Sequence, residues 1–118
     1  MKKEKYIEIQ SVRYSYSGTT LHILKNTISS LNGVDFKDLK ELSIAGNNTI
    51  SSLDGVDFKN LDYLYIEGDN TISSLGGVDF GGLTELYIGG INAISSLDGV
   101  DFKDLKEIHI EAVNGIYI

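Results

Sequence analysis

Apolar and polar residues recur along this chain with a fixed period of 22 residues. The phrase ISSLxGVDF begins at Ile28, Ile50, Ile72 and Ile94, and a fifth coil starts at Ile116. A fixed period of this length is typical of a solenoid, in which each repeat forms one coil. A single coil is too small to bury its own apolar face, so neighbouring coils must stack and share one core.

The pattern within one coil predicts a short strand. In the second coil, apolar and polar side chains alternate over the segment LDYLYIEG, which contains the β-favouring residues Tyr and Ile. Because strand side chains point alternately to opposite faces, Leu64 and Ile66 should face inward while Tyr63, Tyr65 and Glu67 face outward.

The opposite side of the coil should hold a compact turn. Phe58 and Leu61 lie three residues apart, which favours one helical or 3₁₀ turn with Asp57 as its cap. An asparagine also recurs once per coil beside the inward residues, where its amide would pair with buried backbone groups. We expect a buried ladder of Asn26, Asn48, Asn70, Asn92 and Asn114.

Read from its strand, the coil has the pattern LxxLxIxGxNxI, as at Leu61, Leu64, Ile66, Asn70 and Ile72. This pattern resembles the leucine-rich repeat, LxxLxLxxNxL, and its period is most similar to that of bacterial, internalin-type repeats. The inner coils carry one extra residue before the asparagine, which predicts a wider turn there. The resemblance implies a right-handed repeat solenoid over 21–118, with a short parallel β-sheet on the concave face and short helical or 3₁₀ turns or loops on the convex face. It also implies a protein that binds other proteins and catalyses nothing.

Residues 1–20 precede the repeats and are expected to form a β-hairpin cap over the first coil. Alternation over 12–16 and again over 19–23, with Ser17-Gly18 between them, favours a hairpin with a two-residue turn. Tyr6, Ile7 and Ile9 would extend the same cap.

The other end of the chain carries no closing segment after coil four. An apolar solenoid end and an open strand edge both invite pairing. Three interpretations stay open: an array cut from a longer one, a homodimer that meets at this uncapped C-terminal end, or an end that is tolerated open.

The coils agree at their scaffold positions and differ at the outward strand positions. Such variety over a fixed frame is typical of a binding surface, although drift on a solvated face after duplication would give the same pattern. Tyrosine is the expected anchor because it combines apolar area with a hydroxyl, and surrounding glutamates would match a basic patch on a partner protein. His109 beside glutamates would add a mild pH dependence. The predicted partner-binding residues are Tyr63, Tyr65, Tyr87, His109, Glu41, Glu67, Glu85, Glu107 and Glu111.

Composition narrows the classes of partner. Ten basic and 17 acidic side chains give a net charge of −7, which argues against binding to nucleic acid and favours a basic partner. The lysines at the start are followed by no apolar segment of a signal peptide, and no stretch has the length of a membrane span. The chain has no cysteine, so it has neither disulfides nor a cysteine-based zinc site, and its localisation stays open.

Sharper chemical hypotheses find less support. Asp35, Asp57, Asp79 and Asp101 form a row that calcium could bind, yet turn capping explains them without metal. His22 and His109 lie about four coils apart, and no phosphate loop or metal-ligand cluster occurs, so we predict no catalytic residue, metal or cofactor.

Two functions from other classes remain as alternatives. An acidic solenoid could inhibit a nucleic-acid-binding protein by imitating the charge of DNA, although interspersed lysines interrupt the acidic surface. Near-identical coils would also suit a designed or consensus scaffold without a natural ligand.

Overall fold

The computed structural model describes residues 5–24, 28–46, 48–58, 60–68, 71–72, 74–75, 78–89, 100 and 103–111. These residues form a two-stranded sheet and a five-stranded sheet, and they contain no helix. The first sheet consists of β1 (Lys5–Ile9) and β2 (Val12–Tyr16). The second consists of β3 (Thr20–Ile23), β4 (Glu41–Ile44), β5 (Tyr63–Ile66), β6 (Glu85–Ile88) and β7 (Glu107–Ile110).

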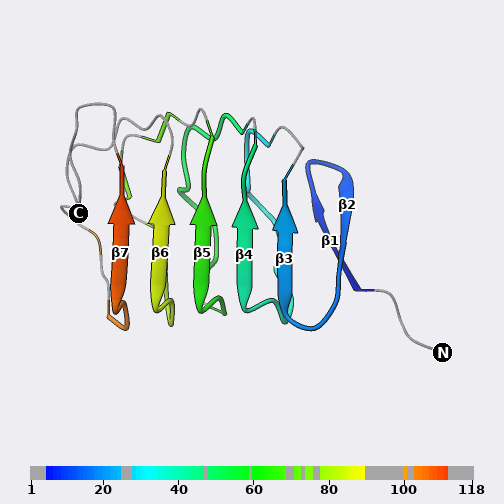
Figure 1. The fold of residues 1–118 in the computed structure, drawn as a ribbon. Coiled ribbons are helices and arrows are strands. Elements are labelled where there is room, and N and C mark those ends of the chain that lie inside the picture. Colours follow the sequence, from blue (N-terminus) through cyan, green and yellow to red (C-terminus); the bar gives the residue numbers. More distant parts are fainter. Residues whose placement is uncertain are drawn as a thin grey trace.

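The five strands of the second sheet run parallel in the order of the sequence, one strand per coil (Figure 1). Equivalent residues lie in register, so that Leu42 pairs with Leu64 and Leu64 with Leu86. Leu64 and Ile66 are fully buried, as the alternating pattern predicts. The solenoid with a parallel sheet is therefore confirmed.

The core lies between this sheet and the turns on the other side of each coil. Leu39, Leu53 and Leu61 are among the fully buried residues that the turn side contributes to it. Phe36, Phe58 and Phe80 stack through the core, with ring centroids 5.7 and 5.9 Å apart and interplanar angles of 22° and 7°. We call these three residues the phenylalanine stack. Each coil thus buries the apolar face of its neighbour, which no coil could do alone.

The turn side consists of hydrogen-bonded β-turns, so loops replace the helical or 3₁₀ alternative in the described residues. The amide of Leu39 donates to the carbonyl of Phe36 at 3.0 Å, and Leu61 and Leu83 repeat this contact in the next coils. Asp35 accepts a hydrogen bond from the amide of Lys37 at 2.9 Å, which is the turn-capping role expected of this row.

The asparagine ladder is visible at one of its predicted members. Asn48 is fully buried, its Oδ1 accepts from the amide of Ile28 at 3.1 Å, and its Nδ2 donates to the carbonyl of Glu67 at 2.9 Å. This side chain therefore ties three successive coils together. Asn26, Asn70, Asn92 and Asn114 lie outside the described residues.

The turn after the strand carries the extra residue of the inner coils. Gly46 and Gly68 have φ values of 101° and 141°, in the region that side chains rarely adopt. A Cβ on Gly68 would lie 2.9 Å from the backbone N and O of Asn48. Glycine at position 68 is thus required both by backbone conformation and by close packing of consecutive coils.

The N-terminal cap is a hairpin, but its strands differ from the expected ones. β1 pairs antiparallel with β2, whereas β2 and the segment after it share only an isolated bridge between Ser17 and Thr20. The strand at 20–23 instead joins the parallel sheet, because Leu21 and Ile23 match the inward residues of β4. The expected pairing of 12–16 with 19–23 is therefore wrong.

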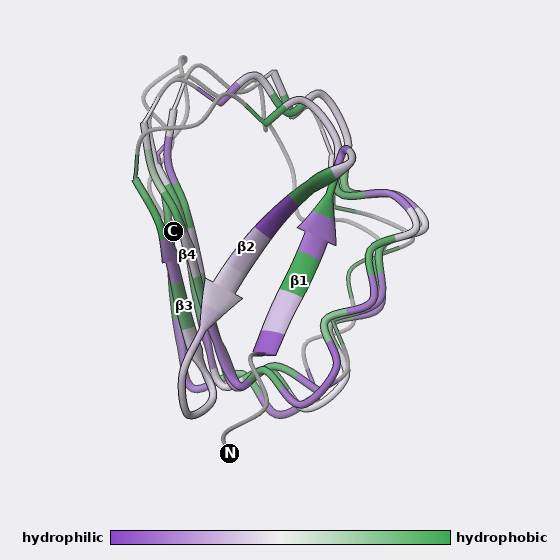
Figure 2. Cartoon of the chain, turned by 90° about the vertical axis from the view of Figure 1, so that its right-hand side faces the viewer, coloured by the Kyte–Doolittle hydropathy of each residue, from purple (hydrophilic) through white to green (hydrophobic). Residues whose placement is uncertain are grey.

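The hairpin lies across the open end of the first coil (Figure 2). Ile7 and Ile9 are fully buried against the core. Gln10 exchanges two hydrogen bonds with Ser29, at 2.8 and 2.9 Å. Lys5 and Tyr16 of the cap also contact Asp38 of the first coil.

The described residues include no helix that is long and apolar enough to cross a bilayer. The predicted end-to-end contact at the C-terminus concerns residues 112–118, which lie outside the described part of the chain.

Candidate functional site: the outer face of the sheet

The outward side chains of β3–β7 and of the residue after each strand form one surface, which we call the sheet face. It has three rows that cross the strands, named by their places in Figure 1. The lower row is Thr20, Glu41, Tyr63, Glu85 and Glu107, and the middle row is His22, Ser43, Tyr65, Tyr87 and His109. The upper row, directly after the strands, is Leu24, Ala45, Glu67, Gly89 and Glu111.

The middle row contains a stack of three rings. Tyr65 and Tyr87 have centroids 4.5 Å apart and planes 12° apart, while Tyr87 and His109 are separated by 4.8 Å and 2°. These distances match the spacing of neighbouring strands, about 4.8 Å, because in-register pairing places the three residues side by side. We call them the aromatic stack.

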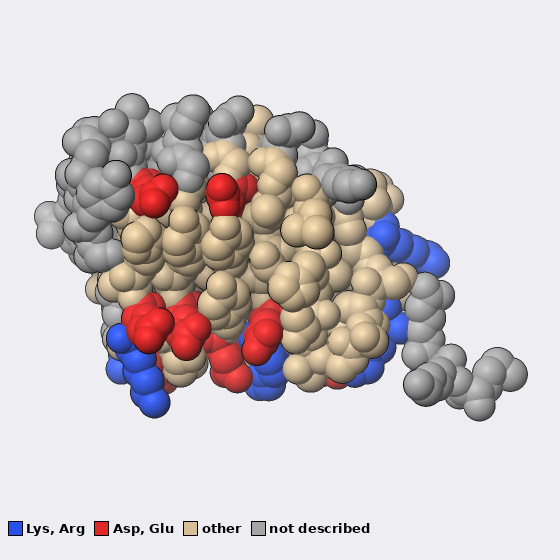
Figure 3. Space-filling view, in the orientation of Figure 1, with Lys and Arg blue, Asp and Glu red and all other residues tan. Residues whose placement is uncertain are grey.

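The stacking decides which part of each ring a partner can touch. Parallel rings cover one another's faces, so Tyr87 presents mainly its edge and hydroxyl. Tyr65 and Tyr87 are half-buried, whereas His109 is exposed. The aromatic stack therefore offers a ridge of ring edges and polar atoms, flanked by acidic side chains above and below (Figure 3).

Carboxylates of the upper row contact the polar ends of Tyr65 and His109 and lie near that of Tyr87. The hydroxyl of Tyr65 donates to Glu67, and this hydrogen bond, followed by burial, raises the pKa of Tyr65. Nε2 of His109 lies 3.4 Å from Oε1 of Glu111. Burial, followed by the charges of Glu111 and Glu67, raises the pKa of Tyr87. Tyr65 and His109 thus each contact a carboxylate of the upper row in addition to stacking.

Gly89 makes room for the central ring. A Cβ at this position would lie 2.7 Å from Cε1 and 2.9 Å from the hydroxyl oxygen of Tyr87. The ring of Tyr87 therefore rests on the backbone of Gly89. The equivalent residues of the neighbouring coils, Glu67 and Glu111, carry long side chains.

The lower row places a third tyrosine between carboxylates. Tyr63 pairs in register with Glu41 on one side and Glu85 on the other. Burial, followed by the charges of Glu85 and Glu41, raises the pKa of Tyr63. The hydroxyl of Thr20 donates to Glu41 at 3.3 Å.

An open hollow of ≈ 650 Å³ lies over β5–β7, between the lower and middle rows. Its aromatic and acidic lining can receive an apolar or cationic side chain. The lining residues are Tyr63, Glu85, Leu86, Tyr87, Lys106, Glu107, Ile108 and His109.

All nine residues predicted for partner binding lie on the sheet face, although they have different positions in it. The aromatic stack joins Tyr65, Tyr87 and His109, while Tyr63 stands apart among the glutamates of the lower row. Ser43 continues the middle row, as the alignment of the repeats predicts, whereas His22 as a further member of this row and the room that Gly89 leaves for Tyr87 were not predicted. The in-register alignment of the repeats was the signal that could have identified them.

The arrangement offers little for catalysis or metal binding. His22 is the register neighbour of Ser43, and no hydrogen bond joins these two described residues. Within the described ranges, no three metal-ligating side chains cluster.

Comparison with known families gives one match. Residues 37–80 match the family model described as leucine-rich repeats (2 copies), a range that contains β4, β5 and Tyr65. No curated protein and no solved structure matches the chain significantly. Leucine-rich repeats generally mediate protein–protein interaction and are typically non-catalytic.

Proposed function

We propose, from the premise that this chain is a leucine-rich repeat protein, that it binds another protein through the sheet face and catalyses no reaction. The observation that carries the proposal is the aromatic stack, three rings aligned on consecutive strands and bordered by carboxylates. Aromatic side chains are enriched among the residues that dominate binding energy at protein interfaces.

The stack is ordered before a partner arrives. Stacking and the hydrogen bond to Glu67 already restrict the rotamer of Tyr65. Ordering a side chain at an interface otherwise costs about 0.5–1.5 kcal/mol. A surface of preordered rings therefore gains affinity because it loses less entropy on binding.

The charge of the surface indicates a basic partner. Five glutamates border the tyrosines, and Lys106 is the lysine that lines the hollow. Complementary charge speeds association and fixes orientation, while desolvated rings supply more of the affinity. The glutamates are Glu41, Glu67, Glu85, Glu107 and Glu111.

The test combines two substitutions in the aromatic stack. Partners would be captured from an extract of the source cell with immobilised wild-type protein, and the purified partner titrated by calorimetry. Changing Tyr65 and Tyr87 together to alanine should weaken binding at least about 30-fold, the effect expected for loss of a hot spot. The control, Thr49→Ala with Thr71→Ala, removes two exposed side chains outside the sheet and should bind as wild type.

Unchanged affinity of the tyrosine variant, with retained circular dichroism, would refute the proposal. The salt dependence of the same titration distinguishes the charge-mimicking alternative. Affinity that collapses between about 50 and 200 mM salt would favour imitation of nucleic acid, whereas binding through desolvated rings should persist.

A further inference from the structure

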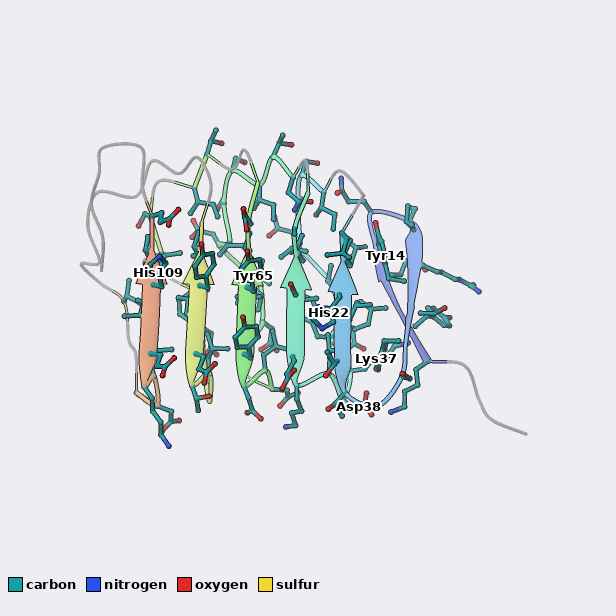
Figure 4. All side chains as sticks on the ribbon, viewed as in Figure 1. Tyr14, His22, Lys37, Asp38, Tyr65 and His109 are labelled. Carbon is teal, nitrogen blue, oxygen red and sulfur yellow. The ribbon has the colours of Figure 1, made fainter. Side chains whose placement is uncertain are left out.

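The middle row contains a gap next to the aromatic stack. Ser43 lies in register between Tyr65 of β5 and His22 of β3, and its half-buried side chain is much shorter than either ring. Ala45, the outward residue that directly follows β4, is also small. Figure 4 shows His22 and Tyr65 on either side of β4. We call the space above Ser43 the Ser43 slot.

The width of the slot suits one flat chemical group. Successive rings of the aromatic stack are 4.5 and 4.8 Å apart. A planar group above Ser43 would therefore continue the stack by one step, against the face of Tyr65 that points away from Tyr87. The strand that carries His22 lies two strand spacings from β5, about 9.5 Å, so His22 bounds the other side.

Acidic side chains border the slot at both ends. Glu41 precedes Ser43 by two residues on the same face of β4. Glu67 directly follows β5, where it accepts a hydrogen bond from the hydroxyl of Tyr65. Leu24, which follows β3, is 62% exposed and adds apolar surface at the upper end. The slot thus combines an aromatic wall, an apolar edge and negative charge.

This combination matches a guanidinium group. Guanidinium is planar, stacks on aromatic faces, and directs its donors in its own plane toward carboxylates, while its aliphatic stem packs on apolar surface. The ammonium of lysine is compact and strongly hydrated, so it would gain from the charges but could not fill the slot. Phosphate-bearing ligands would meet the glutamates unfavourably.

We infer that the Ser43 slot receives an arginine side chain of a basic protein partner. The inference rests on the proposed function, because it assigns one contact within the same surface. It predicts that the sheet face distinguishes arginine from lysine, which charge alone would not do.

The test uses two defined probes, hexa-arginine and hexa-lysine, titrated at 150 mM salt and followed by fluorescence anisotropy. Wild-type protein should bind hexa-arginine about fivefold more tightly, the size expected for one stacked cation at a partly exposed site. Ser43→Tyr fills the slot with the ring that occupies this row on β5 and β6, and it should abolish the preference. The matched control, Ser43→Ala, keeps the slot open and should retain it.

A spectroscopic readout keeps the inference testable if Ser43→Tyr does not fold. Stacking on Tyr65 should shift the δ-proton signals of bound arginine upfield in the wild-type protein, and Tyr65→Leu should remove this shift. Equal binding of the two peptides by the wild type, no upfield shift, or an arginine preference that survives in a folded Ser43→Tyr protein would overturn the inference. None of these results would refute the proposed function. The proposed function is tested separately, by the affinity of the natural partner for the variant with alanine at positions 65 and 87.

Discussion

Two stacks of aromatic rings cross this molecule, one on each side of the coil. The phenylalanine stack is buried beneath the turns, while the aromatic stack of Tyr65, Tyr87 and His109 stands on the sheet face. Both have the same origin, one ring per coil at an equivalent position. A ring on the turn side is buried and stabilises the fold, whereas a ring on the sheet side remains accessible to a partner.

The two stacks also differ in spacing. Ring centroids are 5.7 and 5.9 Å apart in the phenylalanine stack, but 4.5 and 4.8 Å apart in the aromatic stack. Backbone hydrogen bonds hold the strands about 4.8 Å apart, whereas the rings of the phenylalanine stack on the turn side are spaced more widely. This difference fits a solenoid that curves with its sheet on the concave side.

The largest expected effect comes from removing one ring from each stack. Phe58→Ala deletes the fully buried central ring, and it should lower the free energy of unfolding by about 3–5 kcal/mol because a cavity remains. Tyr65→Ala removes a half-buried ring, and it should lower the free energy of unfolding by less than about 1.5 kcal/mol. Urea denaturation followed by circular dichroism measures both. Similar losses in the two variants would show that the sheet face also serves the core.

A second test compares two glycines that follow neighbouring strands. Gly68→Ala would place a Cβ against backbone atoms of Asn48 at a φ of 141°, and it should lower stability by about 2–4 kcal/mol. Gly89→Ala would place a Cβ nearest to the ring of Tyr87, which can swing away, so stability should fall by less than about 1 kcal/mol. The near-ultraviolet circular dichroism of the tyrosines should nevertheless change. A stable Gly68→Ala protein would contradict the packing described between these coils.

The smallest effect concerns the cap, which charged side chains attach to the first coil (Figure 4). Nζ of Lys5 lies 2.8 Å from Oδ2 of Asp38, and the hydroxyl of Tyr16 donates to Oδ1 at 2.6 Å. The hydrogen bond from Lys5, followed by that from Tyr16, lowers the pKa of Asp38. Because the pKa of Asp38 is lower in the folded protein, its carboxylate stabilises the fold at pH values above the unfolded-state pKa of about 3.9. This stabilisation disappears as the pH falls through the folded-state pKa.

We therefore expect Asp38→Asn to unfold at a lower temperature than wild type near neutral pH, with a difference that shrinks below about pH 4. The matched control is Asp104→Asn, which removes an exposed carboxylate from the corresponding position of the last coil. That position lies at the opposite end of the sheet from the cap (Figure 1). The melting temperature of the Asp104→Asn protein should therefore equal that of wild type at every pH. A difference for Asp38→Asn that persists at acid pH would exclude the carboxylate as the cause.

The sequence predicted the repeated coil because its signal is redundant. Leucine and isoleucine recur at the inward positions of every coil, so the register of β4 with β5 has no competitor that buries them equally well. The same alignment placed the tyrosines outward. It did not reveal that Tyr65, Tyr87 and His109 stack, because stacking depends on rotamers and on the space that Gly89 leaves.

The cap was harder to predict for a physical reason. Ser17-Gly18 carries the composition of a hairpin turn, whereas the observed turn uses Gln10 and Ser11, at φ values of 50° and 66° without a glycine. Leu21 and Ile23 gain more from the shared core beside β4 than from a local hairpin. A long-range partner therefore displaced the local one that the sequence favoured.

In-register pairing also governs how this surface could be lengthened. Since each strand aligns residue for residue with the next, inserting one further 22-residue unit would add a single column of outward side chains without shifting any existing row. The reach of the protein would then grow in increments of about 4.8 Å, so a partner's footprint could be matched by gene duplication rather than by redesign.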